Sequence, residues 1–199
     1  MKNICLLLIV LTLSSFACAQ KNDDTLFVAH WNVENLFDTT DDPKTSDEEF
    51  LSSGAKEWND ERLDNKMYNL SRVIRSMNND KGPDLLGVCE VEHQTLLDTM
   101  ITKYLSDKFY KTAYLESMDG RGIDNGIIYD SQKFSLLKVK GHRVDVGGEY
   151  DTRYILEGIF LFEKTDTIYF FVNHWPSRRG GEDVSEPKRI NAAKTLRSV

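Results

Sequence analysis

Apolar residues recur along this chain with two different spacings, and these spacings predict its helices and strands. Between residues 60 and 79 they are three or four positions apart, at Leu63, Met67, Leu70, Ile74 and Met77. That spacing places them on one face of an amphipathic helix. Asn59 or Asp60 can cap the first turn, and Lys81-Gly82-Pro83 stops the helix. We therefore expect a helix over residues 60–79.

The other apolar runs are shorter and are separated by polar turns. Runs rich in β-branched and aromatic residues predict strands at 26–33, 84–89, 109–115, 123–129, 134–144, 153–162 and 167–172. Helical spacing returns at 94–105 and again from Ser185 or Glu186, with Pro187 in the first turn and one face formed by Ile190, Ala193 and Leu196. This order of elements is typical of one α+β domain, which we expect to span residues 25–199.

The first residues have the layout of a secretory signal. A basic start is followed by an apolar run over residues 4–13 and by small residues at Ala17-Cys18-Ala19. We expect residues 1–19 to be a signal peptide, and the mature protein to be periplasmic or secreted. The alternative is a lipoprotein anchored through Cys18, although the residues before it match a lipid-attachment motif poorly. The apolar run is too short to span a bilayer, so we expect no transmembrane segment in the mature chain.

Charge and cysteine content narrow the chemistry. The chain carries a net charge of −7, so its overall field does not attract nucleic acid. A phosphodiester could still bind through a divalent metal and a local group of cations. Cys89 is the one cysteine outside the signal region, which excludes an internal disulfide and predicts a buried, inert thiol. The acidic segment 39–59 lacks the pattern of a calcium-binding EF-hand, and we expect a solvated loop there.

Polar side chains stand at the ends of several predicted strands, where a rigid strand delivers them to an exposed edge. They are Asn32, Glu90, Arg121, Asp124, Asn173, His174 and Arg178. Glu90 is the strongest candidate, because a carboxylate ending a buried apolar strand is costly unless it is paired or metal-bound. Carboxylates suit Mg²⁺, histidine can transfer protons, and arginine matches phosphate. Together they predict metal-assisted phosphodiester hydrolysis.

Several of these residues also have a structural interpretation. Asn32 could be a turn or cap residue, and His174 could be a structural histidine. We expect Glu92 to be a surface charge. The remaining histidines are expected to be structural or solvent-facing; they are His30, His93 and His142.

Four stretches of the chain carry a resemblance when they are read together. They are Trp31–Asp38, Leu86–Glu92, Arg121–Asp124 and Val172–Arg178. In order and spacing they resemble successive motifs of the endonuclease/exonuclease/phosphatase superfamily of DNase I-like proteins. This superfamily includes nucleases, inositol phosphatases and sphingomyelinases. The resemblance implies a four-layer α/β/β/α sandwich and dependence on Mg²⁺, with Mn²⁺ or Ca²⁺ as alternatives.

The resemblance also implies roles for individual residues. Glu90 matches the metal ligand, with Asn32 beside it. His174 would contact the scissile phosphate and assist the leaving group, and Arg121 would hold phosphate. The predicted site therefore comprises catalytic His174 and Asp124, substrate-binding Arg121, Asn173 and Arg178, and metal-binding Glu90 and Asn32.

The chain departs from the family pattern after its last predicted helix. The family continues with a Gly-Asp-Phe-Asn type motif and ends in an Asp-His pair, and neither occurs here. The missing residues help to activate water and supply the partner of His174 across the scissile bond. We therefore expect the N-terminal portion of such a domain, incomplete at its C-terminus and with an incomplete catalytic set: a fragment, a truncated gene product or half of a split protein.

The expected function is that of a Mg²⁺-dependent phosphodiester hydrolase, a secreted or periplasmic nuclease acting on DNA or RNA. One alternative is a phosphatase or phospholipid phosphodiesterase of the same superfamily. The other is an inactive fragment that binds a partner without catalysis.

Overall fold

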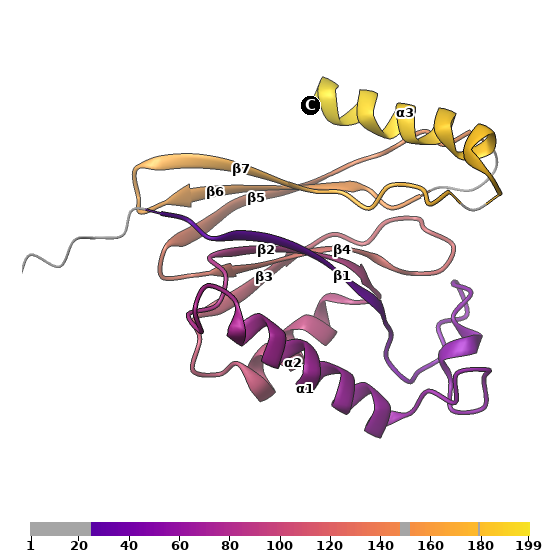
Figure 1. The fold of residues 1–199 in the computed structure, drawn as a ribbon, viewed down its shortest axis with the longest axis horizontal. Coiled ribbons are helices and arrows are strands. Elements are labelled where there is room, and N and C mark those ends of the chain that lie inside the picture. Colours follow the sequence, from indigo (N-terminus) through magenta and orange to yellow (C-terminus); the bar gives the residue numbers. More distant parts are fainter. Residues whose placement is uncertain (1–24, 148–151, 179) are drawn as a thin grey trace, which may run out of the picture.

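The computed structural model describes residues 25–147, 152–178 and 180–199 (Figure 1). The predicted signal peptide at 1–19, with Cys18, lies outside the described residues, as does part of the predicted turn at 145–152. No helix in the described part of the chain is long and apolar enough to cross a membrane.

The first of two β-sheets lies in the middle of the molecule (Figure 1). In spatial order its strands are β1 (Val28–Leu36), β2 (Leu85–Val91), β4 (Asp124–Asp130) and β3 (Tyr110–Tyr114). β1 and β2 run parallel, whereas β4 is antiparallel to both of its neighbours. Because parallel strands end at the same edge of a sheet, β1 and β2 bring their C-terminal residues together, with Asn32 paired to Cys89.

The second sheet packs face to face on the first. It is antiparallel, in the order β5 (Phe134–His142), β6 (Ile155–Phe162) and β7 (Asp166–Val172). The core between the sheets includes Ile127 and Phe160, both fully buried. Gly87 permits a close approach here, because a Cβ at this position would lie 2.8 Å from a methyl carbon of Val172.

Helices cover the two outer faces of this pair of sheets (Figure 1). α1 (Asp60–Ser76) and α2 (Gln94–Tyr104) pack on the first sheet through a core that includes Leu70, Ile74 and Leu97. α3 (Glu182–Ser198) lies over the second sheet, where Ala192 meets Val144 and Ile155. The predicted α+β fold with four α/β/β/α layers is therefore confirmed.

The predicted start of α3 is wrong, and of its predicted inner face only Leu196 packs against the core. The helix begins at Glu182, so Pro187 lies inside it and not in its first turn. Two acidic residues, Glu182 and Asp183, favour this earlier start because they complement the positive end of the helix dipole. The inner face is centred on Ser185 and Ala192, and it leaves Ile190 exposed. Ala193 is exposed too.

The acidic segment after β1 is more than the solvated loop that its composition predicts. Phe50, in a short 3₁₀ helix (Glu48–Phe50), is buried and stacks on Phe37 with ring centroids 4.1 Å apart. The indole Nε1 of Trp58 donates to the Phe37 carbonyl at 3.0 Å. Asp47 is only 2 % exposed. The aromatic residues account for the difference, because they form a small core with Ile123 that holds the segment against the domain.

Candidate functional site

Glu90 lies in an irregular stretch of β2. Its backbone has φ +65°, in the left-handed region that is unfavourable for a residue with a side chain. The register of β2 shifts here against both neighbouring strands, as in a β-bulge. Glu34 and Asn35 of β1 also have positive φ, at 59° and 58°. Such strain persists only where the surroundings hold it, and it gathers at functional sites.

Hydrogen bonds from β1 fix the Glu90 carboxylate. The side-chain Nδ2 of Asn32 donates to Oε1 at 3.0 Å, and the backbone N–H of Asn35 donates to Oε2 at 3.0 Å. The Oδ1 atom of Asn32 accepts from the Glu34 N–H at 2.8 Å, which orients the amide. The carboxylate is therefore preorganised at the edge where β1 and β2 end.

His174 completes this arrangement from the segment that follows β7. Its Nε2 lies 3.3 Å from Glu90 Oε1, whereas its Nδ1 is buried and has no hydrogen-bond partner among the described residues. Burial, assisted by the positive charge of Arg153, lowers the pKa of His174 to about 4. The negative charge of Glu90 opposes this shift without cancelling it. At neutral pH the imidazole is therefore uncharged and able to hold or transfer a proton.

The low pKa of His174 predicts a loss of stability in mild acid. A depressed folded-state pKa stabilises the protein fully above the unfolded value of 6.5, and this contribution is lost as the pH falls toward 4. At pH 4.5 we expect the loss from this group to be about 2–3 kcal/mol relative to pH 7. Urea denaturation in EDTA at both pH values measures it. The His174→Gln variant should lack this component, and equal losses in the two proteins would contradict the prediction.

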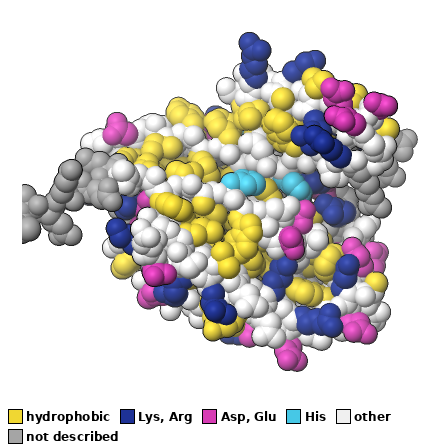
Figure 2. Space-filling view, viewed as in Figure 1, with side chains coloured by type: hydrophobic (Ala, Val, Ile, Leu, Met, Phe, Trp, Pro, Cys, Tyr) yellow, Lys and Arg dark blue, Asp and Glu magenta, His cyan; other side chains and the backbone are white. Residues whose placement is uncertain are grey.

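A cleft of about 410 Å³ opens beside Glu90 and His174. Figure 2 shows histidine side chains near the middle of this face of the molecule, with acidic and basic side chains gathered beside them. The polar residues that line the cleft are Glu90, Asp119, Arg121, Thr152, Arg153, His174, Ser177 and Lys188. Three cationic side chains thus share the cleft with two carboxylates, Glu90 and Asp119, of which Asp119 is paired with Arg153. This composition suits a phosphate group.

Asp119 and Arg153 form a buried ion pair in the wall of the cleft. Arg153 Nη1 lies 2.9 Å from Asp119 Oδ2, and both side chains are largely buried. Asp119 Oδ1 also accepts from the Arg121 backbone N–H at 3.1 Å, so the carboxylate holds the turn that carries Arg121. The sequence analysis missed both residues. The signal for Arg153 was available, because it opens the predicted strand 153–162.

The donor set beside the cleft fits Mg²⁺ in part. Glu90 Oε2 has a lone pair to spare beyond its bond to Asn35, whereas Oε1 faces both Asn32 and His174 Nε2. Mg²⁺ often takes one or two carboxylates and keeps its waters. The Asn32 amide oxygen is turned toward Glu34 N–H, so its amide nitrogen faces the carboxylate. Glu90 is therefore the residue best placed to hold the ion, with Asn32 orienting it.

The other predicted site residues lie outside the residues that line this cleft. Asp124 is buried, and its Oδ2 accepts from the Ser117 N–H at 2.9 Å. Burial raises the pKa of Asp124. Asn173 Oδ1 accepts from the Trp175 indole at 3.3 Å. Arg178 lines a separate hollow between the segment after β7 and α3. The structure therefore brings together Asn32, Glu90, Arg121 and His174. The other three residues do not line the cleft, so no contact supports the roles predicted for them.

Glu92 was expected to be a surface charge, and this expectation is wrong. Its side chain is 2 % exposed, and its Oε2 accepts from the Asp38 N–H at 2.6 Å. Burial raises the pKa of Glu92 to about 7. The missed cause is the segment after β1, whose Asp38 N–H binds this side chain and whose Asp47 lies close enough for its charge to act on it.

Comparison with solved structures identifies the fold. The chain resembles an endonuclease/exonuclease/phosphatase family protein from Bacteroides thetaiotaomicron, with a TM-score of 0.57 and 14% sequence identity. The match covers 87% of this chain and 57% of that protein. The chain also resembles a mannosyl-6-phosphatase from the same species (TM-score 0.56, 15% identity, 87% and 58% covered). The catalytic domain of human Nocturnin with bound sulfate is similar as well (TM-score 0.54, 12% identity, 87% and 58% covered).

At these identities the structural likeness establishes the fold alone, and the chain spans 57–58% of the length of these structures. A search among curated proteins returns no match. The sequence itself, however, matches the Endonuclease/Exonuclease/phosphatase family over residues 27–199. The chain therefore belongs to this family of phosphoester hydrolases.

Proposed function

We propose that this chain provides the metal-binding and phosphate-binding part of a Mg²⁺-dependent phosphodiester hydrolase whose substrate is nucleic acid. The observation that carries the proposal is the contact of His174 with Glu90, 3.3 Å apart, at the mouth of a cleft with three cationic side chains. Mg²⁺ bound at Glu90 would neutralise charge on the phosphoryl oxygens.

We assign a separate role in catalysis to each of the residues at the cleft. Glu90 holds the ion, and Asn32 and the Asn35 N–H keep its carboxylate in position. Arg121, Arg153 and Lys188 bind the non-bridging phosphate oxygens, since each lines the cleft. His174 is neutral before reaction and exchanges a proton with an oxygen of the substrate through Nε2. Its burial beside Glu90 excludes bulk water from that position.

The experiment compares the full-length protein with its Glu90→Gln variant on single-stranded DNA, RNA and bis-p-nitrophenyl phosphate, with Mg²⁺ and with EDTA. We expect hydrolysis that requires Mg²⁺ and falls by at least about 100-fold in Glu90→Gln, because the variant loses the charged ligand. The Glu48→Gln variant changes an exposed carboxylate in the 3₁₀ helix and is the matched control. Full activity in Glu90→Gln would sink the assignment of the site.

A second candidate is a phosphomonoesterase, favoured by the small volume of the cleft and its three cationic residues. A solved structure of the same fold is a mannosyl-6-phosphatase. The same assay with mannose 6-phosphate and p-nitrophenyl phosphate separates the two, because a nuclease should prefer the diester substrates. A chain that binds Mg²⁺ and turns over neither class would support the third possibility, a non-catalytic binding protein.

We place this activity in the periplasm or outside the cell, because residues 1–19 have the pattern of a signal peptide. Mass spectrometry of the mature N-terminus tests this. A chain beginning at Gln20 supports release, a lipid-modified Cys18 supports anchoring, and an intact Met1 contradicts both.

A further inference from the structure

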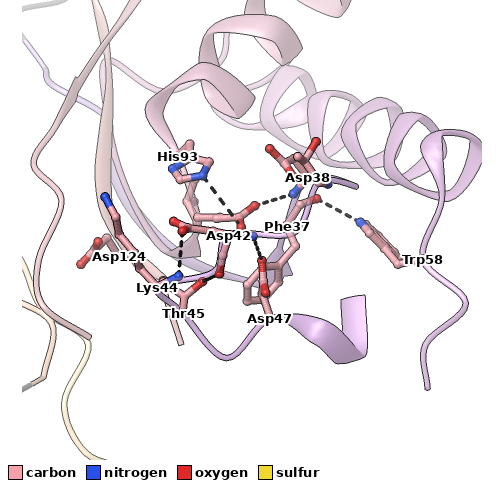
Figure 3. Close-up of polar contacts among 12 residues, drawn as sticks. Phe37, Asp38, Asp42, Lys44, Thr45, Asp47, Trp58, His93 and Asp124 are labelled. Carbon is pink, nitrogen blue, oxygen red and sulfur yellow. Dashed lines mark hydrogen bonds and ion pairs between the residues drawn. The ribbon is translucent and has the colours of Figure 1, made fainter. Parts of the chain in front are cut away.

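A second group of side chains that could ligate a metal ion lies beyond Glu90, just after the end of β2. Asp38, Glu92 and His93 each offer one ligand atom, and these atoms all lie within 4.8 Å of one another. Asp38 follows β1, and His93 is the N-cap residue of α2, whose side chain makes no capping hydrogen bond. Figure 3 shows Asp38 and His93 approaching from opposite sides. Two segments that are far apart in the sequence, the loop after β1 and the link between β2 and α2, therefore meet at this group.

A buried oxygen without a partner lies next to this group. Asp47 is 2 % exposed, and its Oδ1 has no hydrogen-bond partner among the described residues. Its other oxygen, Oδ2, accepts from the Asp42 N–H at 3.1 Å, so the side chain is held in place. Asp47 lies close enough for its charge to act on the Glu92 carboxylate. Figure 3 shows Asp47 joined to Asp42, on the side of Asp42 away from Asp38 and His93.

The charges of this group are not balanced by protein cations. Within the described ranges, no lysine or arginine makes an ion pair with Asp38, Asp47 or Glu92, and His93 Nε2 lies 3.9 Å from Glu92 Oε1. A buried carboxylate without a cationic partner is destabilising, and in proteins such groups are usually paired with a cation or bound to a metal ion. A divalent cation here would be ligated by Asp38, Glu92 and His93, and it would satisfy Asp47 Oδ1 directly or through a water molecule.

We propose that Asp38, Glu92 and His93, with Asp47, bind a divalent transition-metal ion at a site separate from Glu90. One imidazole nitrogen with several carboxylate oxygens suits Zn²⁺ or Mn²⁺ better than Ca²⁺, which prefers oxygen ligands alone. The two carboxylates bind different parts of the chain, because Glu90 accepts from the Asn35 N–H near the end of β1 whereas Glu92 accepts from the Asp38 N–H just after it. The ion at the second site fixes the acidic segment against the end of β2.

The test uses calorimetric titration of the Glu90→Gln protein with Zn²⁺ and, separately, with Mn²⁺. Because this variant lacks the first site, we expect one remaining equivalent of bound metal. Adding Asp38→Asn and His93→Gln should weaken that binding by at least about tenfold, since even outer partners of metal ligands are worth that much. The proposal is overturned if Glu90→Gln binds neither metal, or if the added substitutions leave the affinity unchanged.

These substitutions are chosen so that the fold survives them. Asp38 and His93 are only half-buried, and an asparagine at 38 keeps the oxygen that accepts from the Thr40 N–H at 2.6 Å. Thermal unfolding in EDTA should therefore be the same in Glu90→Gln and in the triple variant, and added Zn²⁺ should raise the melting temperature of Glu90→Gln alone. The readout is metal binding, so it is independent of whether the protein hydrolyses phosphoesters.

Discussion

Replacing His174 with alanine should lower kcat for Mg²⁺-dependent phosphodiester hydrolysis by about 10²- to 10⁴-fold, the range found for the loss of a general acid or base. The imidazole is neutral, half-buried and 3.3 Å from Glu90, so its removal eliminates a proton carrier at the mouth of the cleft. KM should change much less, because three cationic residues still line the cleft. Steady-state kinetics of the full-length protein over pH 5–9 measure both constants.

The matched control for this variant is His30→Gln. His30 is an exposed histidine on β1, and its Nε2 contacts the Cys89 sulfur at 3.2 Å and not the cleft. Its replacement should leave kcat within about twofold, the ordinary scatter for a group that takes no part in the reaction. A His174→Ala protein with the kcat of wild type would remove His174 from the mechanism.

Replacing Arg153 with alanine should reduce the free energy of unfolding by about 3–5 kcal/mol, because it removes the closest cationic partner of the buried Asp119 carboxylate. The ion pair measures 2.9 Å, and its two side chains are 12% and 8% exposed. Urea denaturation gives the value. The double variant Asp119→Ala/Arg153→Ala should recover part of the loss, since neither charge then remains.

Arg178→Ala is the control for this cycle, because Arg178 is exposed and an exposed substitution usually changes stability by less than about 0.5 kcal/mol. Additive losses in the Asp119/Arg153 double variant would show that the two residues act independently. That result would contradict the role assigned here to the pair, which is to hold the wall of the cleft and the turn of Arg121.

Sequence patterns were sufficient for the order of the elements and for the prediction that Asn32, Glu90 and His174 lie together. Glu90 and Asn32 follow from one rule: two parallel strands end at the same edge, so polar residues at their ends meet. His174 followed from its position after the apolar strand β7. The buried, unreactive state of Cys89 was also predicted correctly, and burial raises the pKa of its thiol to about 12.

The features that were missed depend on contacts between distant segments. Asp119 lies in a turn, and nothing in its local sequence reveals that Arg153, in the segment before β6, will neutralise it. The sequence around Glu92 predicts a surface charge, but the side chain is buried in the structure. The acidic segment is held against the domain by the stacking of Phe50 on Phe37, which the local sequence does not reveal. The start of α3 was missed because Pro187 is more often found in a first turn than five residues inside a helix.

The end of β1 and the residues just after it connect Glu90 of β2 with Glu92, which follows β2. Asn35 N–H donates to Glu90 at 3.0 Å and Asp38 N–H donates to Glu92 at 2.6 Å, so one short segment is held at both points. A ligand that holds this segment more tightly at one of the two hydrogen bonds restricts its movement at the other. Thermodynamic linkage then requires that a ligand of the Glu92 site change affinity at Glu90 by the same factor as the reverse, so the acidic segment would act as an effector site for the cleft.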